Sequence, residues 1–522
     1  MNEYANIPQE KFQLASDKFV NHDKKLDTKS VGYFRDAWNR FKKNKASIAA
    51  AIIIILLVLF SVVSSIVSPY TVSYNDTYLR FVYPTSKLSL ALGIDFWDGC
   101  KSTELPEQSF MHYYAMGVET GHLAVKNNKY TVKEGVGTKY YTFRLDSYHQ
   151  TGVVYMDVTV DQYNDIQKYQ NETGKQVIYP QTVVAKRPKD VQYSNDANFW
   201  YATKQESFVE ETGKASKKKR TVPDLDADGN FQNIYIAYNG KDGYDSLRIE
   251  GETPEYNYAI VNQTGYNIRV NYYEYYIYNH TYVLKDGIKE PYFFFGTTNY
   301  GQDIFTCLGS GARLSFALAI VVSLVNLIVG AIYGAIEGYY GGVADLMMER
   351  FSDILNAVPF MIVITLLKFH FGANLSQLAI LFIAFFLTGW IGMASMTRMQ
   401  FYRFKNQEYV LAARTLGAKD ARIMFKHIFP NSLGTLITSS VLVIPGMIFS
   451  ESSLSYLGII NLSTGNMTSV GNMLADAQPF LSSYPHMILF PSLFISLLML
   501  SFNLFGNGLR DAFNPSLRGS ED

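Results

Sequence analysis

The sequence contains few of the residues that hold disulfide-rich or zinc-dependent folds together. Its 522 residues include only two cysteines, Cys100 and Cys307, and eight scattered histidines. A disulfide scaffold needs many cysteines and a Cys/His zinc site needs clustered ligands, so the first is excluded and the second is disfavoured. Charge of one sign is also lacking, because 46 Lys and Arg balance 46 Asp and Glu. A net charge of zero gives no electrostatic reason to expect nucleic acid as a partner.

Patterns of catalysis are lacking as well. The chain has no G-x-x-x-x-G-K-[ST] phosphate loop, so it cannot hold ATP by that route. No nucleophile, base and orienting group fall in a recognisable arrangement, so the sequence gives no support to the hypothesis that the chain is an enzyme. We therefore expect a chain that binds no cofactor of its own.

What the sequence does have is an uneven distribution of hydrophobic residues. The averages look globular, with 48% hydrophobic residues and a mean hydropathy of -0.02. Charge-free apolar runs nevertheless gather towards both ends of the chain, around a polar and tyrosine-rich middle. A helix needs about 20 mostly apolar residues to cross the hydrocarbon core of a membrane. Six segments qualify: 46–68, 314–336, 354–371, 375–397, 432–450 and 487–505.

Two of these six spans need comment. The segment 46–68 starts 45 residues into the chain and lacks a signal-peptide cleavage site after it, so we predict a retained membrane anchor. The segment 354–371 is the weakest candidate because it holds Lys368 and His370 near one end.

Basic residues predict the orientation of the spans, because Lys and Arg accumulate in short cytoplasmic flanks. Residues 1–45 hold ten of them and the loop 398–431 holds seven, whereas the loop from Gly458 to His486 holds none. Both termini and the loop 398–431 are therefore predicted to be cytoplasmic in a multi-pass protein of the cell membrane. The predicted parts are a tail (1–45), an anchor helix (46–68), an extracellular domain (69–311), a core with the other five spans (312–505) and a second tail (506–522).

The predicted extracellular domain shows the alternation of β-strands. Stretches beginning at Tyr141 (YTFRLDSY), Val153 (VVYMDVTV) and Asn267 (NIRVNYYEYYIY) alternate at period two, which favours strands with one buried face. The fold class that follows is a polytopic α-helical membrane protein with six transmembrane helices and a β-rich (α+β) extracellular domain inserted between helices 1 and 2.

One motif in that domain suggests a metal. The stretch DLDADGN places Asp224, Asp226 and Asp228 at alternate positions before Gly229, as at the start of a calcium loop. Position twelve, where a bidentate Glu is expected, is Tyr235. A plain Asp/Gly-rich turn is therefore the preferred interpretation, with calcium as the alternative.

Several residues within the spans predict packing or a pathway. Gly330, Gly334 and Gly338 recur every four residues and favour close helix packing. Pro359, Pro445 and Pro491 are each expected to interrupt a span. A carboxylate in hydrocarbon is costly, so Glu451 near the predicted outer end of a span belongs either at the interface or beside a wet cavity. With Ser452 and Ser453 it forms our candidate for a translocation path or gate.

The segment Glu408–Asn431 (EYVLAARTLGAKDARIMFKHIFPN) carries the clearest functional signal. Its apolar spacing predicts two short helices broken at Gly417, with Asp420 capping the second helix and Pro430 stopping it. Ala412 and Ala413 leave room for another surface to approach closely. The pattern alone fits a docking element and an amphipathic connector on the membrane equally well.

The segment resembles the coupling-loop signature of ABC importer permeases: Ala412-Ala413, then Gly417, then Pro430. Glu408, followed by YVLAAR, and His427 before IFPN are similar to the oligopeptide/dipeptide/nickel group. Further stretches resemble its C-type permease subunit, namely AWNRFKKNKAS, FGTTNYGQDIFTCLGSGARLSF, GYYGGVADLMMERFSDILNAVPF, ESSLSYLG and FNLFGNGLRDAFNPSLRG. The sequence departs from the family pattern at Leu411, Phe429, Thr298, Gln302 and Cys307, and in the length of the loop 69–311.

The resemblance implies a function and a set of partners. The chain is expected to be the membrane-embedded permease subunit of an ATP-driven importer of oligopeptides or dipeptides. ATP and Mg are expected to bind to partner subunits and not to this chain. Its expected partners are a second permease, two ATPase subunits, an extracellular substrate-binding protein and a peptide. The 408–430 loop is expected to sit in a groove on one of the ATPases. The alternatives are a permease for nickel or another small solute and, in a different class, an exporter-type or receptor subunit with a large external domain.

Overall fold

Helices from both ends of the chain form one long bundle. The computed structural model describes residues 33–135, 138–189, 193–209, 215–236, 244–245, 258–464 and 466–513. Most of the first predicted tail (1–32) and the end of the second (514–522) lie outside the described residues. The main bundle helices are α1 (Tyr33–Lys43), α2 (Lys45–Val67), α7 (Ile304–Tyr340), α8 (Gly342–Asn356), α9 (Phe360–Phe371), α10 (Gln377–Phe404), α13 (Phe429–Tyr456), α14 (Val470–Ala477) and α15 (His486–Phe513).

Among the described residues, five helices are long and apolar enough to cross a membrane, and a sixth crossing exists if one bent pair counts as a span. The five are α2, α7, α10, the continuous run Asp420–Tyr456 that contains α13, and α15. The six-span prediction is therefore shown only in part, because the span predicted at 354–371 is a bent pair of helices, interrupted at Pro359 as expected. Here α8 and α9 meet at 71°. Pro359 cannot donate to the helix ladder and disfavours helical geometry in the residue before it, so the chain bends there.

The predicted packing role of the three glycines is confirmed. A Cβ at Gly330 would lie 2.6 Å from the carbonyl oxygen of Trp390, and one at Gly338 would lie 2.8 Å from that of Arg398. At Gly334 a Cβ would overlap the carbonyl of Ala394. These glycines let α7 pack directly on the backbone of α10.

The prediction that prolines interrupt two further spans is wrong. Pro445 lies inside α13 and Pro491 inside α15, and both helices continue through them. Each proline removes one helical hydrogen bond, which neighbouring helices tolerate in a buried setting. Both prolines are buried in this bundle.

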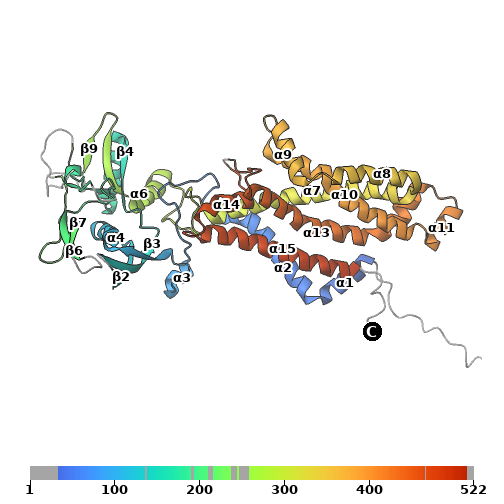
Figure 1. Ribbon diagram of the computed structural model, residues 1–522, viewed down its shortest axis with the longest axis horizontal. Helices are drawn as coiled ribbons and strands as arrows, with labels where there is room; N and C mark the ends of the chain where they lie inside the picture. The colour runs from blue at the N-terminus through green and yellow to red at the C-terminus, as the bar shows by residue number, and fades with distance from the viewer. Residues whose placement is uncertain are drawn as a thin grey trace, which may run out of the picture.

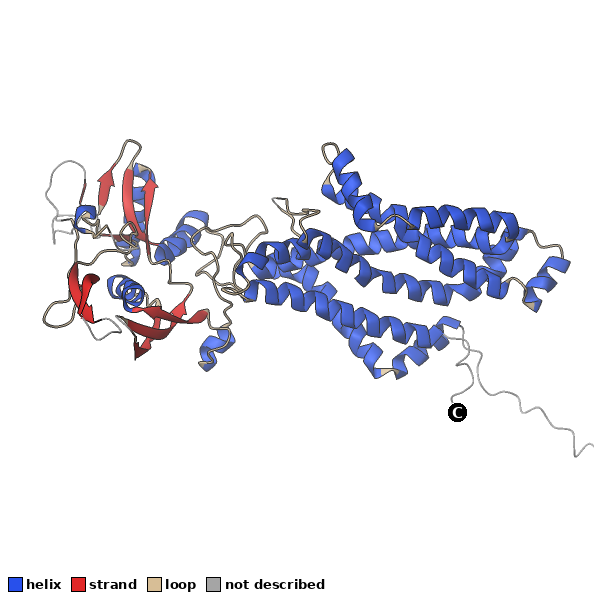
Figure 2. Cartoon of the chain, viewed as in Figure 1, coloured by secondary structure: helices blue, strands red, loops and turns tan. Residues whose placement is uncertain are grey.

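Residues between α2 and α7 form a lobe of strands and helices beyond one end of the bundle (Figure 2). One antiparallel sheet has the strand order β1-β3-β2, and a second has β4-β10-β9-β8 with β5 also paired to β10. Strands β6 and β7 form a separate hairpin. The bounds are β1 (Cys100–Pro106), β2 (Val125–Glu134), β3 (Lys139–Asp146), β4 (Val153–Val158), β5 (Ile178–Tyr179), β6 (Thr203–Val209), β7 (Ala215–Pro223), β8 (Tyr244–Asp245), β9 (Ala259–Val261) and β10 (Tyr266–Asn271). Helices α3 (Lys87–Leu92), α4 (Glu107–Thr120), α5 (Val160–Thr173) and α6 (Tyr272–Tyr278) complete the lobe.

The strands predicted from Tyr141 and Val153 correspond to β3 and β4, but the third prediction is half wrong. The stretch from Asn267 is a strand only as far as Asn271, and the tyrosines that follow form α6. The Asn271 side chain accepts a hydrogen bond from the backbone N–H of Glu274 and so caps the helix. The period-two alternation gave the wrong prediction for these tyrosines, because a buried helix can also carry aromatic residues on more than one face.

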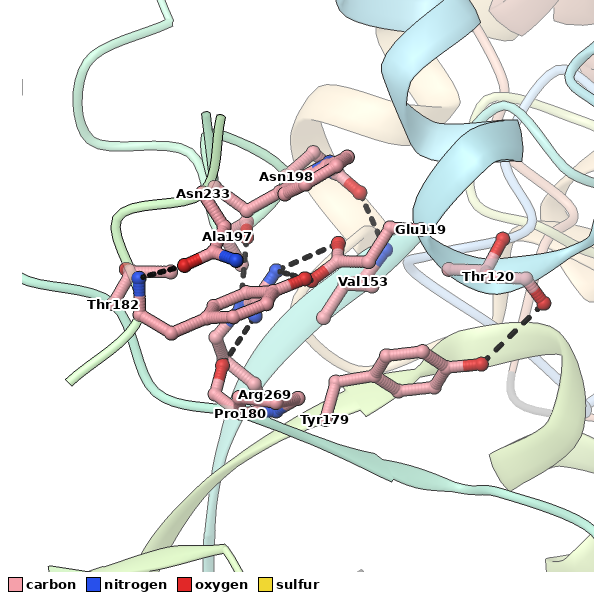
Figure 3. A network of polar contacts seen from close by, with 12 residues as sticks. Glu119, Thr120, Val153, Tyr179, Pro180, Thr182, Ala197, Asn198, Asn233 and Arg269 are labelled. Carbon is pink, nitrogen blue, oxygen red and sulfur yellow. Dashed lines mark hydrogen bonds and ion pairs between the residues drawn. The ribbon is translucent and has the colours of Figure 1, made fainter. Parts of the chain in front are cut away.

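A buried ion pair ties the lobe together (Figure 3). Arg269 on β10 is fully buried, and its guanidinium lies 2.9 Å from the carboxylate of Glu119 on α4. It also donates to the carbonyl oxygens of Ala197, at 2.9 Å, and Pro180. The phenol of Tyr235 donates to the same carboxylate at 2.9 Å. One side chain therefore joins a helix, a strand and two loops.

The two ends of the bundle differ in what they carry (Figure 1). The lobe continues from one end, whereas α11 (Glu408–Thr415), α1 and the last turns of α15 gather at the other. Phe41 of α1 packs edge-on against Phe505 of α15, which holds the first helix to the last. The segment between α10 and α13 thus lies at the far end of the molecule from the lobe.

Candidate functional site

The segment Glu408–Ile428 forms a bent pair of helices, which we call the helical elbow. Its first arm is α11, and its second is α12 (Asp420–Arg422) followed by the π-helical turns η5 (Ile423–Ile428). The second arm runs without a break into α13. The elbow stands at the end of the bundle opposite the lobe (Figure 1).

Gly417 makes the bend, as its position in the sequence predicts. Its φ of 82° is left-handed, a conformation that a β-carbon disfavours. The N–H of Gly417 donates to the carbonyl of Arg414 at 3.0 Å, and the N–H of Ala418 donates to that of Ala413 at 3.1 Å. This pattern of a glycine just past the helix, with bonds back to its last turn, closes α11 firmly.

One face of the elbow packs on the bundle. Val410 and Ala413 from α11 are buried together with Ile423, Met424 and Ile428 from η5. All of these except Ala413 form an apolar cluster with Ala335, Tyr339 and Phe401 at the ends of α7 and α10. The elbow is therefore a rigid extension of three bundle helices.

The opposite face of the elbow is exposed. Leu416, directly before the bend, exposes 88% of its surface, and Phe425 exposes 51%. Glu408, Ala412 and Pro430 are exposed nearby. Large apolar side chains held out on a rigid tip are typical of a surface that another protein covers.

Two local predictions at the elbow are wrong. Asp420 does not cap α12, because Lys419 holds the cap position and no side chain bonds there. The Asp420 carboxylate instead accepts a 2.6 Å hydrogen bond from the phenol of Tyr339 at the end of α7. Pro430 does not stop a helix, because the helical run Asp420–Tyr456 continues through it.

A second set of contacts steadies the elbow from outside its apolar cluster. Arg414 approaches the phenol oxygen of Tyr339 at 3.4 Å and lies over its ring. The amide of Asn431 donates to the phenol oxygen of Tyr409 at 3.0 Å and to the carbonyl of His427 at 2.9 Å. His427 thus takes part through its backbone, half-buried in η5.

A charged cluster fixes the bundle beside the elbow. Arg398 of α10 makes a two-pronged pair with Asp345 of α8, with distances of 2.6 and 2.9 Å, and reaches Glu349 at 3.0 Å. Glu337 of α7 lies 3.5 Å away, and Tyr402 donates to Asp345 at 2.5 Å. Bidentate arginine pairs of this kind are geometrically specific, so α7, α8 and α10 are held in one arrangement here.

Glu451 lies near the lobe end of α13 and is almost fully buried. Its carboxylate accepts hydrogen bonds from Ser315 of α7 at 2.8 Å, from Ser455 at 3.2 Å and from Ser452 at 3.4 Å. Ser452 is also buried, whereas Ser453 is half-buried and donates to the carbonyl of Phe449 at 2.8 Å. Hydroxyl donors therefore compensate the buried carboxylate.

A cavity of about 510 Å³ opens next to this cluster, at the lobe end of the bundle. Ser455 lines it, and Glu451 sits one layer behind that wall. Polar walls come from Asn299, Gln302, Asn461, Asn472 and Asp476, and apolar walls from Ile304, Ile460, Met467, Met473 and Met487. A polar and apolar mixture of this kind suits a solute with a polar backbone.

Two of the candidate calcium residues, Asp224 and Asp226, already bond to other groups of the chain. The Asp226 carboxylate accepts hydrogen bonds from the N–H groups of Asp228 and Asn230 at 2.9 and 2.8 Å. Asp224 pairs with Lys204 at 3.1 Å. Across the described part of the chain, no three His, Cys, Asp or Glu side chains converge as a metal site would require. Cys100 and Cys307 are both free thiols.

Three residues of this site escaped the sequence prediction. Tyr339 and Arg398 carry no local motif, because their partners lie 81 and 53 positions away. Leu416 has the spacing of a buried helix residue and yet points outwards at the bend. Only Leu416, next to an expected glycine break, carried a usable signal.

Fold and site together define a polytopic helical membrane protein with a rigid, exposed elbow between two of its spans. Residues 328–519 match the family described as the inner membrane component of binding-protein-dependent transport systems, and residues 32–84 match the N-terminal transmembrane domain of oligopeptide transport permease C.

Similar curated proteins include permeases for peptides. The oligopeptide transport permease protein OppC of Bacillus subtilis is 42% identical over 224 residues, which cover 43% of this chain and 72% of that protein. The dipeptide transport permease protein DppC of the same organism is 40% identical over 225 residues, covering 43% and 69%. A solved inward-facing MetNI methionine ABC transporter overlaps 40% of this chain and 96% of its own at 15% identity and a TM-score of 0.33.

This chain belongs to the family of binding-protein-dependent transport permeases, as a C-type subunit of the oligopeptide and dipeptide group. Members of this class are permeases of ABC importers and not enzymes, and they work with a second permease and with ATPases that hydrolyse ATP.

Proposed function

We propose that this chain conducts oligopeptides or dipeptides into the cell and that its helical elbow is the part gripped by a partner ATPase. The observation that carries the proposal is the elbow itself, with Leu416 exposed at a glycine-locked bend while its other face is fixed to α7 and α10. A rigid lever of this kind transmits motion, because its buried face cannot slide independently of the bundle. The names of the relatives support peptides as the solute.

The proposed orientation places the elbow, α1 and both termini in the cytoplasm. The basic residues of 1–45 and 398–431 favour that side. Helix α1 and the elbow lie at one end of the bundle and the lobe lies at the other, which supports the same orientation. The lobe is then extracellular, and the bent pair α8 and α9 completes a sixth crossing.

The cavity beside Ser455 is proposed as the outer part of the solute path. An extracellular binding protein would deliver peptide there, and the second permease would close the open side. Glu451, Ser452 and Ser453 flank this path, with Glu451 acting through Ser455 and not by direct contact with solute.

Reconstitution of the whole importer in proteoliposomes tests the proposal. With ATP inside the vesicle on the side of the elbow, labelled di- to pentapeptides loaded on the binding protein should accumulate, and Gly417→Pro should stop their uptake. Accumulation of free Ni²⁺ or another small solute without any peptide uptake would contradict the choice of peptide.

A further inference from the structure

A short apolar finger projects where the lobe meets the bundle. It comprises residues 86–97: helix α3, a turn at Gly93 and the chain back to Trp97. No residue of α3 is buried. Five large apolar side chains of the finger each expose between 47% and 69% of their surface: Leu88, Leu90, Leu92, Ile94 and Phe96.

The base of the finger is firmly built. The N–H of Ser86 donates to the carbonyl of Trp97 at 2.8 Å and closes the loop. Below it, Thr85 donates to the carbonyl of Phe293 at 3.2 Å, and Gly99 donates to that of Pro84 at 2.9 Å. An exposed apolar tip on a well-bonded base is a presented surface and not a frayed end.

Aromatic contacts fix the height of the finger against the bundle. The Trp97 ring lies 5.5 Å from Phe490 in the second turn of α15 and 6.2 Å from Phe295. Phe295 in turn lies 6.4 Å from Phe60 of α2. The finger therefore stands level with the ends of the membrane-spanning helices, and tryptophan accumulates at that level in membrane proteins.

Little of the described chain covers the flank that carries the finger. Only 17% of the most apolar stretch of α2 is buried, against 50% for α7. Ile66 and Val67, in the last turn of α2 on the lobe side, are both exposed. In the view of Figure 1, α3 and α2 lie on the same flank, opposite α8, α9 and α10.

We propose that the finger inserts into the lipid leaflet on the lobe side and holds the lobe against the membrane surface. Residues 88–94 contain no charge, so they can enter the acyl region. Lys87 at the start of α3 lies over the ring of Tyr292 at 5.3 Å, which keeps its ammonium at headgroup height. We assign lipid and not the second permease as the occupant, because the uncharged, exposed surface of the finger continues the poorly covered apolar side of the membrane-spanning helix α2.

Depth measurements on spin labels test this in the intact importer in nanodiscs. Cys100 and Cys307 are replaced by Ser and Ala, and a nitroxide is attached at Leu88→Cys or Leu92→Cys. Val261→Cys on β9 is the matched control, because it is similarly exposed but lies at the far end of the lobe. The ratio of collisions with oxygen to collisions with a water-soluble nickel chelate should be at least tenfold higher at the finger than at Val261.

Two results would overturn the inference. Equal nickel access at Leu92 and Val261 would place the finger in water. A finger label shielded from both oxygen and nickel, together with a cross-link to the second permease or binding protein, would assign it to a protein partner. The proposal does not depend on the transported solute, so failure of peptide uptake would leave this test unaffected.

Discussion

The phenol of Tyr339, at the end of α7, donates a 2.6 Å hydrogen bond to the carboxylate of Asp420, at the start of the second arm of the elbow. Tyr339 also packs in the apolar cluster beneath the elbow. This contact joins a membrane-spanning helix directly to the proposed lever. A bond to a charged acceptor contributes about 1.5–3 kcal/mol, enough to favour one of two arrangements by tenfold or more.

Tyr339→Phe should therefore loosen coupling while the chain still folds. The ring remains for packing, but the bond to Asp420 is lost. We expect about tenfold fewer peptides imported per ATP hydrolysed, which paired uptake and ATPase assays measure. Tyr340→Phe is the matched control, since Tyr340 is the next residue and is exposed. If Tyr339→Phe imports as many peptides per ATP hydrolysed as the wild type, the bond to Asp420 has no part in coupling.

Gly417→Pro should abolish uptake with the protein still inserted. Proline fixes φ near −65°, whereas this position has 82°, and it removes the N–H that bonds to Arg414. Gly417→Ala keeps that N–H and should lose only part of the activity, because a left-handed alanine costs about 1–2 kcal/mol. Membrane fractionation confirms insertion. Full uptake by the proline variant would show that the bend is dispensable.

Gly334→Leu should separate α7 from α10. An added side chain would collide with the backbone of Ala394, and overpacking of this kind costs about 1–3 kcal/mol or displaces a helix. A lower unfolding temperature in nanodiscs is the expected result. Gly446→Leu serves as control, because no atom lies within 4 Å of a Cβ there. Equal unfolding temperatures for the two variants would argue against the close packing.

Arg269→Met should destabilise the lobe by about 3–5 kcal/mol, because it leaves the buried Glu119 carboxylate without its partner. Thermal unfolding followed by tryptophan fluorescence measures this, since Trp97 and Trp200 both belong to the lobe. Arg80→Met, at an exposed position, should have little effect. A stable Arg269→Met chain would mean that the ion pair does not hold the lobe together.

Acid should weaken the contact between the finger base and the sheet. Burial opposes ionisation of Asp98, but hydrogen bonds from Lys126 and Arg144, both at 2.6 Å, outweigh it and lower the pKa of the carboxyl. A lowered pKa in the folded state gives stability that is present above the ordinary value of 3.8 and is lost as pH falls through the folded value.

The effect of Asp98→Asn on the unfolding temperature should therefore be largest near neutral pH and shrink below about pH 4. Asp95→Asn is the control, because Asp95 meets the same two cations but is mostly exposed. A pH-independent difference between wild type and Asp98→Asn would contradict this account of the pair.

Sequence alone predicted what depends on local chemistry. Apolar runs predicted the main helices because a membrane span must satisfy its own backbone, and Gly417 predicted the bend because few residues other than glycine tolerate its φ. Pro359 predicted the break between α8 and α9, but not whether the bent pair makes one crossing, because a short apolar run with a proline fits either one span or two helices. The role of Asp420 was missed because the sequence does not show whether a carboxylate near a helix start caps that helix or bonds to a distant residue such as Tyr339.

Cross-linking at Leu416 tests the central claim most directly. In the assembled importer with Cys100 and Cys307 replaced, Leu416→Cys carrying a short photoactivatable probe should cross-link to an ATPase subunit, with a yield that changes when ATP is added. Val261→Cys with the same probe should give no such product. Absence of any ATPase product at Leu416, or labelling of Leu416 only from the side of the membrane that carries the lobe, would contradict the account.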